Sequence, residues 1–264
     1  MDTEINKLDV WKELTEIEKA GISSALVTVI ATKGSTPREV GAKMIVFADG
    51  RTSGTVGGSA VEVLIIKDAV DAIKEGKAHK VEYKLHQEDE DSTGMLCGGV
   101  MEFFIEPLKR VPRLYIFGGG HVGLALAKLV TELGYPYTVL DDRAEFASDE
   151  RFPHADERIS GPYDELTDNL ELIEPAYIVI VTAGHDSDLK VLRGVLGKKY
   201  HYLGMICSKK KKVEVFKILE DEGFSKGELE KVHAPIGLKI GGRSPAEIAV
   251  SIMAEVMQVF YQAK

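Results

Sequence analysis

The sequence is poor in cysteine and has neither a long apolar run nor an excess of positive charge. Its two cysteines, Cys97 and Cys207, are too few for a disulfide framework, which favours a reducing, cytoplasmic compartment. No segment approaches the run of about 18 apolar residues that a transmembrane helix needs, so we expect no membrane association. The formal net charge of −9 disfavours nucleic acid as a partner, because nucleic-acid-binding surfaces are normally basic.

The sequence also lacks the motifs of several common catalytic machineries. It shows no Ser-His-Asp spacing, no P-loop lysine motif and no paired-carboxylate signature. A dehydrogenase needs a positioned acid or base beside its nicotinamide, and His185 is the one attractive candidate. These absences favour a binding role over catalytic turnover.

The pattern of apolar residues changes near the middle of the chain. Residues 1–108 combine short β-branched runs with amphipathic helical segments and predict a small mixed α/β domain. A linker with two prolines, Pro107–Pro112, follows. In residues 109–264, apolar strands alternate with helices, which predicts a Rossmann-like domain with a parallel sheet covered on both faces. The predicted fold class is therefore α/β. Four strands are expected in the second domain: Arg113–Phe117, Tyr137–Leu140, Tyr177–Thr182 and Tyr202–Ile206.

A glycine-rich loop follows the first strand of the second domain. Gly118, Gly120 and Gly123 form G-x-G-x-x-G between this strand and a helix, with Gly119 and His121 inside the motif. Glycine allows a tight turn and a close backbone approach to phosphate, and the helix N-terminus favours negative charge. The motif therefore predicts a nucleotide or cofactor phosphate site, and the alternative is a strand–turn–helix without a ligand.

An acidic residue ends the next strand. Asp141 lies at roughly the spacing of about 20 residues expected for an acid that binds a ribose hydroxyl. Its charge would repel a ribose 2′-phosphate and favours NAD-like or AMP-like groups, although Arg143 weakens that preference.

Further loops are expected at the same edge of the sheet. Gly184 and His185 follow the third strand, and a run of four lysines, residues 209–212, follows the fourth. Ligands in such sheets bind beyond the carboxyl ends of the strands, so these loops and His121 should converge on one crevice. The lysines either hold a phosphate or begin a solvated helix. The histidines are interpreted as polar loop residues rather than as a zinc cluster. Near the chain's end, Ser244 and Glu247 predict a capping box.

Three glycine-rich loops occur in the first half of the chain. They cover residues 34–41, 54–59 and 94–99, and include Gly57 and Gly58 in the second loop. Consecutive glycines allow backbone N–H groups to point together into an anion-binding nest. In the third loop, Cys97 precedes Gly98 and Gly99, and such a nest could lower the pKa of its thiol and suit it to metal ligation or sulfur transfer. The alternative is a small buried cysteine in a tight turn.

At these loops the chain resembles the xanthine dehydrogenase accessory factor family, also called XdhC/CoxI. The resemblance covers nearly the whole chain and is much more specific than the glycine motif alone. Its segments are GSTPREVGAKM (34–44), GTVGG (54–58), CGG (97–99), FGGGHVG (117–123), LDDR (140–143), TAGHDSD (182–188) and HAPIGLKIGGRSPAEIAVSIMAE (233–255).

The resemblance implies an accessory factor, often dimeric, that binds molybdenum cofactor, protects it during sulfuration and delivers it to a molybdenum hydroxylase of the xanthine dehydrogenase type. A cysteine desulfurase is then a further expected partner. The phosphate or nucleotide end of molybdopterin would lie at Gly118–Gly123, and the loops around Cys97, as metal ligand, would hold the metal end.

The chain departs from the family pattern at two positions. Ala60 stands where the family commonly has a cysteine, and Cys207 stands where a glycine is more usual. If the cofactor's sulfur needs the missing thiol, Cys97 must act alone, and otherwise this member holds a different ligand or nucleotide only. Two alternative functions are an NAD-dependent oxidoreductase and a nucleotide-binding regulatory module without chemistry.

Overall fold

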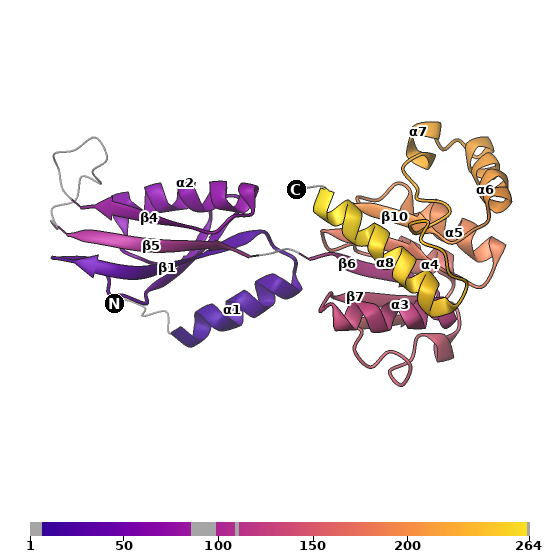
Figure 1. Ribbon diagram of the computed structural model, residues 1–264, viewed down its shortest axis with the longest axis horizontal. Helices are drawn as coiled ribbons and strands as arrows, with labels where there is room; N and C mark the ends of the chain where they lie inside the picture. The colour runs from indigo at the N-terminus through magenta and orange to yellow at the C-terminus, as the bar shows by residue number, and fades with distance from the viewer. Residues whose placement is uncertain (1–6, 86–98, 109–110, 263–264) are drawn as a thin grey trace. The chain divides into compact units, whose positions relative to one another are not determined.

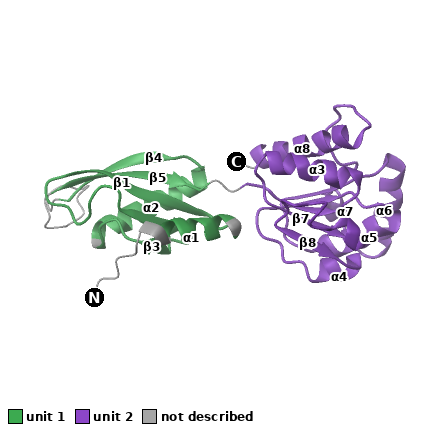
Figure 2. Ribbon diagram, turned by 90° about the horizontal axis from the view of Figure 1, so that it is seen from below, with its two compact units in different colours: residues 1–110 green, residues 111–264 purple. Residues whose placement is uncertain are grey.

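The computed structural model describes residues 7–85, 99–108 and 111–262. The chain divides into two compact units, residues 1–110 and residues 111–264 (Figure 2). Each unit has its own sheet and its own apolar core.

Unit 1 is built on a five-stranded antiparallel sheet with the strand order β3-β2-β1-β5-β4. Its strands are β1 (Ser24–Lys33), β2 (Lys43–Phe47), β3 (Thr52–Gly54), β4 (His79–Lys84) and β5 (Val100–Pro107). The β-branched residues of β1 suit the centre of the sheet, where both faces are covered. Helices α1 (Lys7–Lys19) and α2 (Ser59–Glu75) lie on opposite faces (Figure 1).

Side-chain periodicity explains how the helices of unit 1 bind their sheet. Val61, Ile65 and Ala69 recur every four residues along α2 and are fully buried in the core of one face. On the other face, Val10 and Ile17 of α1 contact a smaller apolar cluster. The long antiparallel pairing of β1 with β5 contains an irregularity between Val29 and Ala31.

Unit 2 is a parallel five-stranded sheet with the order β10-β9-β6-β7-β8. Its strands are β6 (Arg113–Phe117), β7 (Tyr137–Asp141), β8 (Glu157–Ser160), β9 (Ala176–Ile180) and β10 (Tyr202–Met205). Every residue of β6, β7, β9 and β10 is buried, as expected for parallel strands covered on both faces.

Helices cover both faces of this sheet. They are α3 (His121–Glu132), η1 (Ala144–Phe146), α4 (Tyr163–Asp168), α5 (His185–Val195), α6 (Lys209–Asp221), α7 (Lys226–Leu229) and α8 (Pro245–Gln262). Helices α3 and α8 pack together on one face, and α4 and α5 pack together on the other (Figure 2). The chain runs from β6 outward to β8 and then returns to β9 on the other side of β6. In sheets of this kind, such a reversal makes the carboxyl ends of the two central strands, here β6 and β9, the expected position for a ligand.

The structure confirms the predicted fold class and adds elements that the sequence pattern did not show. Strand β8 has four residues, all partly or fully exposed, so it carries no run of buried residues to detect. Strand β3 has three residues. The capping box is confirmed, because the Ser244 hydroxyl accepts the backbone N–H of Glu247 and the Glu247 carboxylate accepts the backbone N–H of Ser244.

Candidate functional site

Three glycines of the loop after β6 are required by the protein's own backbone. Gly118 has φ of 108°, and a β-carbon on it would lie 2.4 Å from the carbonyl oxygen of Val181. A β-carbon on Gly119 would lie 1.8 Å from the carbonyl oxygen of Phe146. On Gly123 it would lie 1.9 Å from the carbonyl oxygen of Gly118. Any side chain at these positions would therefore collide with main chain, so these glycines shape the turn.

Gly120 differs from the other three glycines of the loop. Its φ of −65° and ψ of −163° are open to any residue, and no described atom lies within 4 Å of a β-carbon built on it. The described protein therefore gives no steric reason for glycine at this position. A backbone that must approach a ligand closely would give one.

The N-terminus of α3, which begins just after Gly120, is suited to an anion. No side chain of the described residues caps it, and its first turn carries no acidic residue. By contrast, α5 begins with Asp186 and Asp188, and α6 is capped by the Ser208 hydroxyl. The first N–H groups of a helix need acceptors, and the helix dipole favours a negative one. Of these three helices at the carboxyl edge, α3 is the one prepared for an external phosphate.

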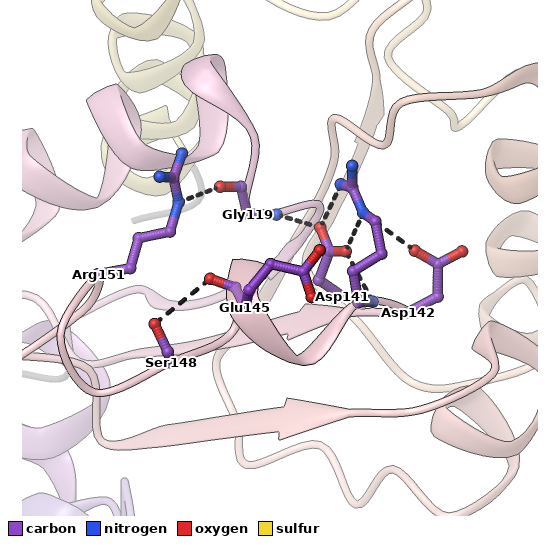
Figure 3. A network of polar contacts seen from close by, with 7 residues as sticks. Gly119, Asp141, Asp142, Glu145, Ser148 and Arg151 are labelled. Atoms are coloured by element: carbon purple, nitrogen blue, oxygen red, sulfur yellow. Dashed lines mark hydrogen bonds and ion pairs between the residues drawn. The ribbon is translucent and has the colours of Figure 1, made fainter.

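Asp141 lies at the centre of a polar network beside the loop (Figure 3). Its carboxylate is fully buried and accepts the backbone N–H of Gly119 at 2.7 Å. It also accepts the backbone N–H, Nε and Nη2 of Arg143 at 3.0, 2.9 and 3.0 Å. Burial by itself would raise the pKa of Asp141, but these hydrogen bonds outweigh it and hold the pKa below its usual range. Its oxygens are thus already engaged by the loop and by Arg143. The prediction that Asp141 binds a ribose hydroxyl remains a prediction.

Two guanidinium groups lie beside the loop, and both contact the ring of Phe146. The central guanidinium carbon of Arg143 lies 3.7 Å from the ring centroid, and that of Arg151 lies 5.1 Å from it. Arg151 also donates from Nε to the carbonyl oxygen of Gly119 at 2.8 Å (Figure 3). No sequence motif marks Arg151, because its place beside the loop depends on the path of the chain after η1.

Helix α5 is joined to the loop before it and to α6 through one buried carboxylate, that of Asp188. Asp188 is fully buried and accepts hydrogen bonds from the Thr182 hydroxyl and the Lys211 ammonium group. Burial raises the pKa of Asp188, although both donors oppose the rise. Lys211 belongs to the lysine run, which forms the first turn of α6. Burial also raises the pKa of the nearby Cys207 thiol, which disfavours a reactive thiolate there.

A pocket of about 310 Å³ opens next to Asp141, between the loop after β7 and the starts of α4 and α5. Six residues line it: Asp142, Pro162, Tyr163, Asp186, Ser187 and Lys190. Burial, followed by the neighbouring Asp141 carboxylate, raises the pKa of Asp142. Gly184 and His185, predicted as site residues, immediately precede Asp186 at the start of α5. The structure thus brings the loop after β7 close to the first turns of α4 and α5, while the predicted convergence of His121, His185 and the lysine run on one crevice remains a prediction.

The described parts of the glycine-rich segments of unit 1 lie close together. A β-carbon on Gly99 would lie 2.3 Å from the carbonyl oxygen of Ser35, so Gly99 contacts the first loop. A β-carbon on Gly57 would lie 3.1 Å from Pro37, so the second loop contacts the first as well. Cys97 and Gly98 lie outside the described residues, and the predicted metal ligand is therefore placed by sequence alone.

The nest expected at the second loop is filled by the chain's own carboxylate. Oε1 of Glu62 accepts the backbone N–H groups of Val56 and Gly58 at 3.0 and 2.9 Å, and the Thr55 hydroxyl at 2.6 Å. Burial would raise the pKa of Glu62, but these hydrogen bonds together lower it. The glycine pattern predicted an anion-binding nest but not its occupant. That occupant is Glu62, which follows Gly58 by only four residues.

Removing the Glu62 carboxylate is expected to destabilise unit 1. Glu62→Ala leaves two loop N–H groups without their acceptor, at a cost of about 1–3 kcal/mol. Because folding lowers the pKa of Glu62, its contribution is present above the ordinary value of 4.5 and is lost as pH falls through the folded value. Fluorescence of Trp11, the single tryptophan, follows unfolding of this unit in urea.

Glu62→Gln is the matched variant, since it keeps one carbonyl acceptor but does not titrate. The stability difference between wild type and Glu62→Gln should shrink as pH falls below about 4.5. A difference that stays constant between pH 7 and pH 3 would contradict the role assigned to this carboxylate.

A second network ties the last part of the chain to the sheet. Glu255 on α8 accepts the Tyr202 hydroxyl at 2.6 Å and the backbone N–H of Gly237 at 2.8 Å, and it pairs with Nδ1 of His233 at 3.3 Å. This network explains His233 as a structural residue.

No group of three or more His, Cys, Asp or Glu residues suited to a metal occurs in the part of the chain that the structure describes. Among the described helices, none has the length and apolarity to cross a membrane.

Comparison with known protein families identifies the relatives of this fold. The family described as XdhC Rossmann domain matches residues 114–256, more than half of the chain. The family described as XdhC and CoxI matches residues 18–84. The chain belongs to the XdhC and CoxI family.

Individual relatives agree with this assignment. The XdhC-family chain is 30% identical over 253 residues to "Uncharacterized protein YqeB" of Escherichia coli K12, covering 96% of the chain and 46% of that protein. It therefore spans about half the length of this relative. The chain is also 21% identical over 289 residues to "Molybdenum cofactor insertion chaperone PaoD" of the same organism. This match covers 91% of the chain and 84% of that protein. A crystal structure described as a xanthine dehydrogenase from Bacillus halodurans shares the fold, with a TM-score of 0.52, 22% identity and 96% coverage of both chains.

Proposed function

We propose that this XdhC-family protein binds molybdenum cofactor as cargo and delivers it to a molybdenum hydroxylase of the xanthine dehydrogenase type. The relative that is named as a cofactor insertion chaperone supports this role. The role requires tight binding and release to a partner and does not require stabilisation of a transition state. It agrees with a sequence that offers few groups for acid–base catalysis.

The observation that carries the proposal is the open backbone at Gly120. The uncapped first turn of α3 and the missing side chain together provide N–H donors and room for a phosphate. Arg143 and Arg151 add positive charge beside the same loop. The phosphate of molybdopterin, or of its nucleotide extension, fits this set of donors.

The contacts of Asp141 favour this ligand over NAD. A dinucleotide site of the usual kind uses the acid after the second strand to accept a ribose hydroxyl. Here the carboxylate accepts four hydrogen bonds from Gly119 and Arg143 and is fully buried. In our proposal Asp141 therefore holds the phosphate loop and the Arg143 side chain in position. The guanidinium groups of Arg143 and Arg151 then face the phosphate.

The metal end of the cofactor is assigned to unit 1 as part of the same proposal. Gly57 of the second loop and Gly99 both contact the first loop, at Pro37 and Ser35, and Cys97 precedes Gly99 by two residues in the sequence. Cys97 is proposed to ligate molybdenum or to carry sulfur, with a cysteine desulfurase as sulfur source. A homodimer is proposed on the same grounds of resemblance.

The proposal is tested by reconstitution of a client enzyme. We expect this protein, together with a source of molybdenum cofactor, to raise the activity of a cofactor-free enzyme of the xanthine dehydrogenase type several-fold above the cofactor source alone. Cys97→Ser should reduce this activation while leaving the circular dichroism spectrum unchanged. Enzyme activity is measured with xanthine as substrate.

The same preparation tests the oxidoreductase alternative. The protein alone, offered NAD or NADH with xanthine, hypoxanthine or simple aldehydes, should show no turnover. Steady NAD-dependent turnover that His185→Ala abolishes would replace the chaperone proposal by a dehydrogenase. Failure to activate any client while cofactor is bound would reduce the function to storage or sensing.

A further inference from the structure

The pocket next to Asp141 is lined by both hydrogen-bond acceptors and hydrogen-bond donors. Asp142, after β7, and Asp186, in the first turn of α5, supply carboxylates. Ser187 and Lys190 supply a hydroxyl and an ammonium group from α5. The ammonium group of Lys190 also pairs with Asp164 at 3.3 Å, but both side chains are largely exposed, so this pair is weak and can be redirected.

The pocket wall also contains a buried hydroxyl without a well-placed partner. Tyr163 is 3% exposed, and its hydroxyl has no partner of good hydrogen-bond geometry among the residues that the structure describes, the nearest being the backbone of Asp142. The ring of Tyr163 packs against the ring of Phe117, with 6.3 Å between the two ring centroids. Buried polar groups are nearly always paired, so a poorly paired hydroxyl beside a pocket points to a ligand group that completes it.

The size and position of the pocket suit one heterocyclic ring of a phosphorylated ligand. Its volume of about 310 Å³ lies at the lower end of the range of about 300–1,000 Å³ found for small-molecule sites. Asp142 directly follows Asp141, which accepts the N–H of Gly119 in the phosphate loop. The phosphate loop and this pocket are thus linked within unit 2 through the neighbouring residues Asp141 and Asp142.

We propose that the pocket takes the 2-amino-4-oxopyrimidine ring shared by pterins and guanine, and discriminates against adenine. This inference rests on the proposed function, because the ring is placed by a phosphate held at Gly120. The shared ring presents an amino group and an adjacent ring N–H, which pair with the two oxygens of one carboxylate. Its carbonyl oxygen then accepts a hydrogen bond from Tyr163, Ser187 or Lys190.

Adenine presents the wrong pattern to this pocket. Its amino group lies beside an unprotonated ring nitrogen, and that nitrogen would face a carboxylate oxygen without a proton between them. It also lacks the carbonyl oxygen that the donors on α5 and Tyr163 would satisfy. Leaving such groups unpaired is what makes polar pockets selective.

The experiment measures affinities of the full-length protein by calorimetry for GMP, AMP, XMP and a pterin that carries a side-chain phosphate. Wild-type protein should bind GMP or the pterin phosphate about 10- to 100-fold more tightly than AMP. The relative affinity of GMP and the pterin phosphate identifies which end of the cofactor the pocket holds. Asp142→Asn or Asp186→Asn should abolish the preference over AMP and improve XMP, because an amide can donate to the 2-oxo group of xanthine.

Asp168→Asn is the matched control. Asp168 is an exposed acid at the end of α4 and does not line the pocket, so this variant should leave all affinities unchanged. Circular dichroism verifies that each variant is folded. Equal binding of GMP, pterin phosphate and AMP to wild type would overturn the inference and leave the phosphate site intact. A preference that survives in both Asp142→Asn and Asp186→Asn would also overturn it. Absence of binding by all four phosphates would overturn both this inference and the phosphate site.

Discussion

Gly120→Val is expected to lower the affinity for a phosphorylated ligand by about 100-fold or more. The valine side chain would occupy the space from which a phosphate reaches the first N–H groups of α3. Loss of two hydrogen bonds to a charged group costs about 3 kcal/mol, which corresponds to roughly a hundredfold in affinity. Because Gly120 has an ordinary φ and no described atom within 4 Å of a β-carbon, the variant should fold normally. Calorimetry with the phosphate ligands named above measures the effect.

Gly197→Val is the matched control for this substitution. Gly197 also has open space around a β-carbon, and it follows the C-terminal end of α5, at the edge of the sheet opposite the phosphate loop. This variant should bind ligand as wild type does. Unchanged affinity in folded Gly120→Val would remove the phosphate loop from the binding site and with it the main support for the proposed function.

Asp141→Ala is expected to destabilise unit 2 by about 3 kcal/mol. The substitution removes the acceptor of the Gly119 N–H and the closer carboxylate partner of Arg143, which then keeps only the longer contact with Asp142 at 3.5 Å. Arg143 is 36% exposed, so water replaces part of what is lost and the cost stays at the low end for a broken buried pair. Circular dichroism is the appropriate probe in denaturant, because the single tryptophan lies in unit 1.

Asp149→Ala provides a comparison at a surface ion pair. Asp149 lies 3.1 Å from Nε of Arg158, but its side chain is 92% exposed, and such pairs add little stability. We expect no measurable change for this variant. If Asp141→Ala were equally stable and lost only ligand affinity, Asp141 would be a ligand-contacting acid, as the sequence spacing suggested, and not a residue that positions the loop.

Sequence reasoning succeeded where local patterns carry the information. Strand β6 was predicted at its observed bounds, because the apolar run Leu114–Phe117 directly precedes the glycine motif. It failed at β8, where no residue is buried and the alternation of apolar and polar residues is absent. Residues of the candidate site were found when they formed a motif and missed when they did not. Arg151 and Tyr163 carry no motif and reach the site through the folded path of the chain.

By itself, the sequence determined the family, the α/β class and the phosphate loop, because glycine spacing and apolar periodicity are properties of neighbouring residues. The tertiary structure decided what each of these residues contacts. It showed that Gly118, Gly119 and Gly123 are needed by the backbone while Gly120 is open, and that Glu62 fills the nest of unit 1. It also showed that the carboxylate of Asp141 already accepts hydrogen bonds from Gly119 and Arg143. Burial and hydrogen-bond partners depend on segments that are distant in sequence, and only the folded chain brings those segments together.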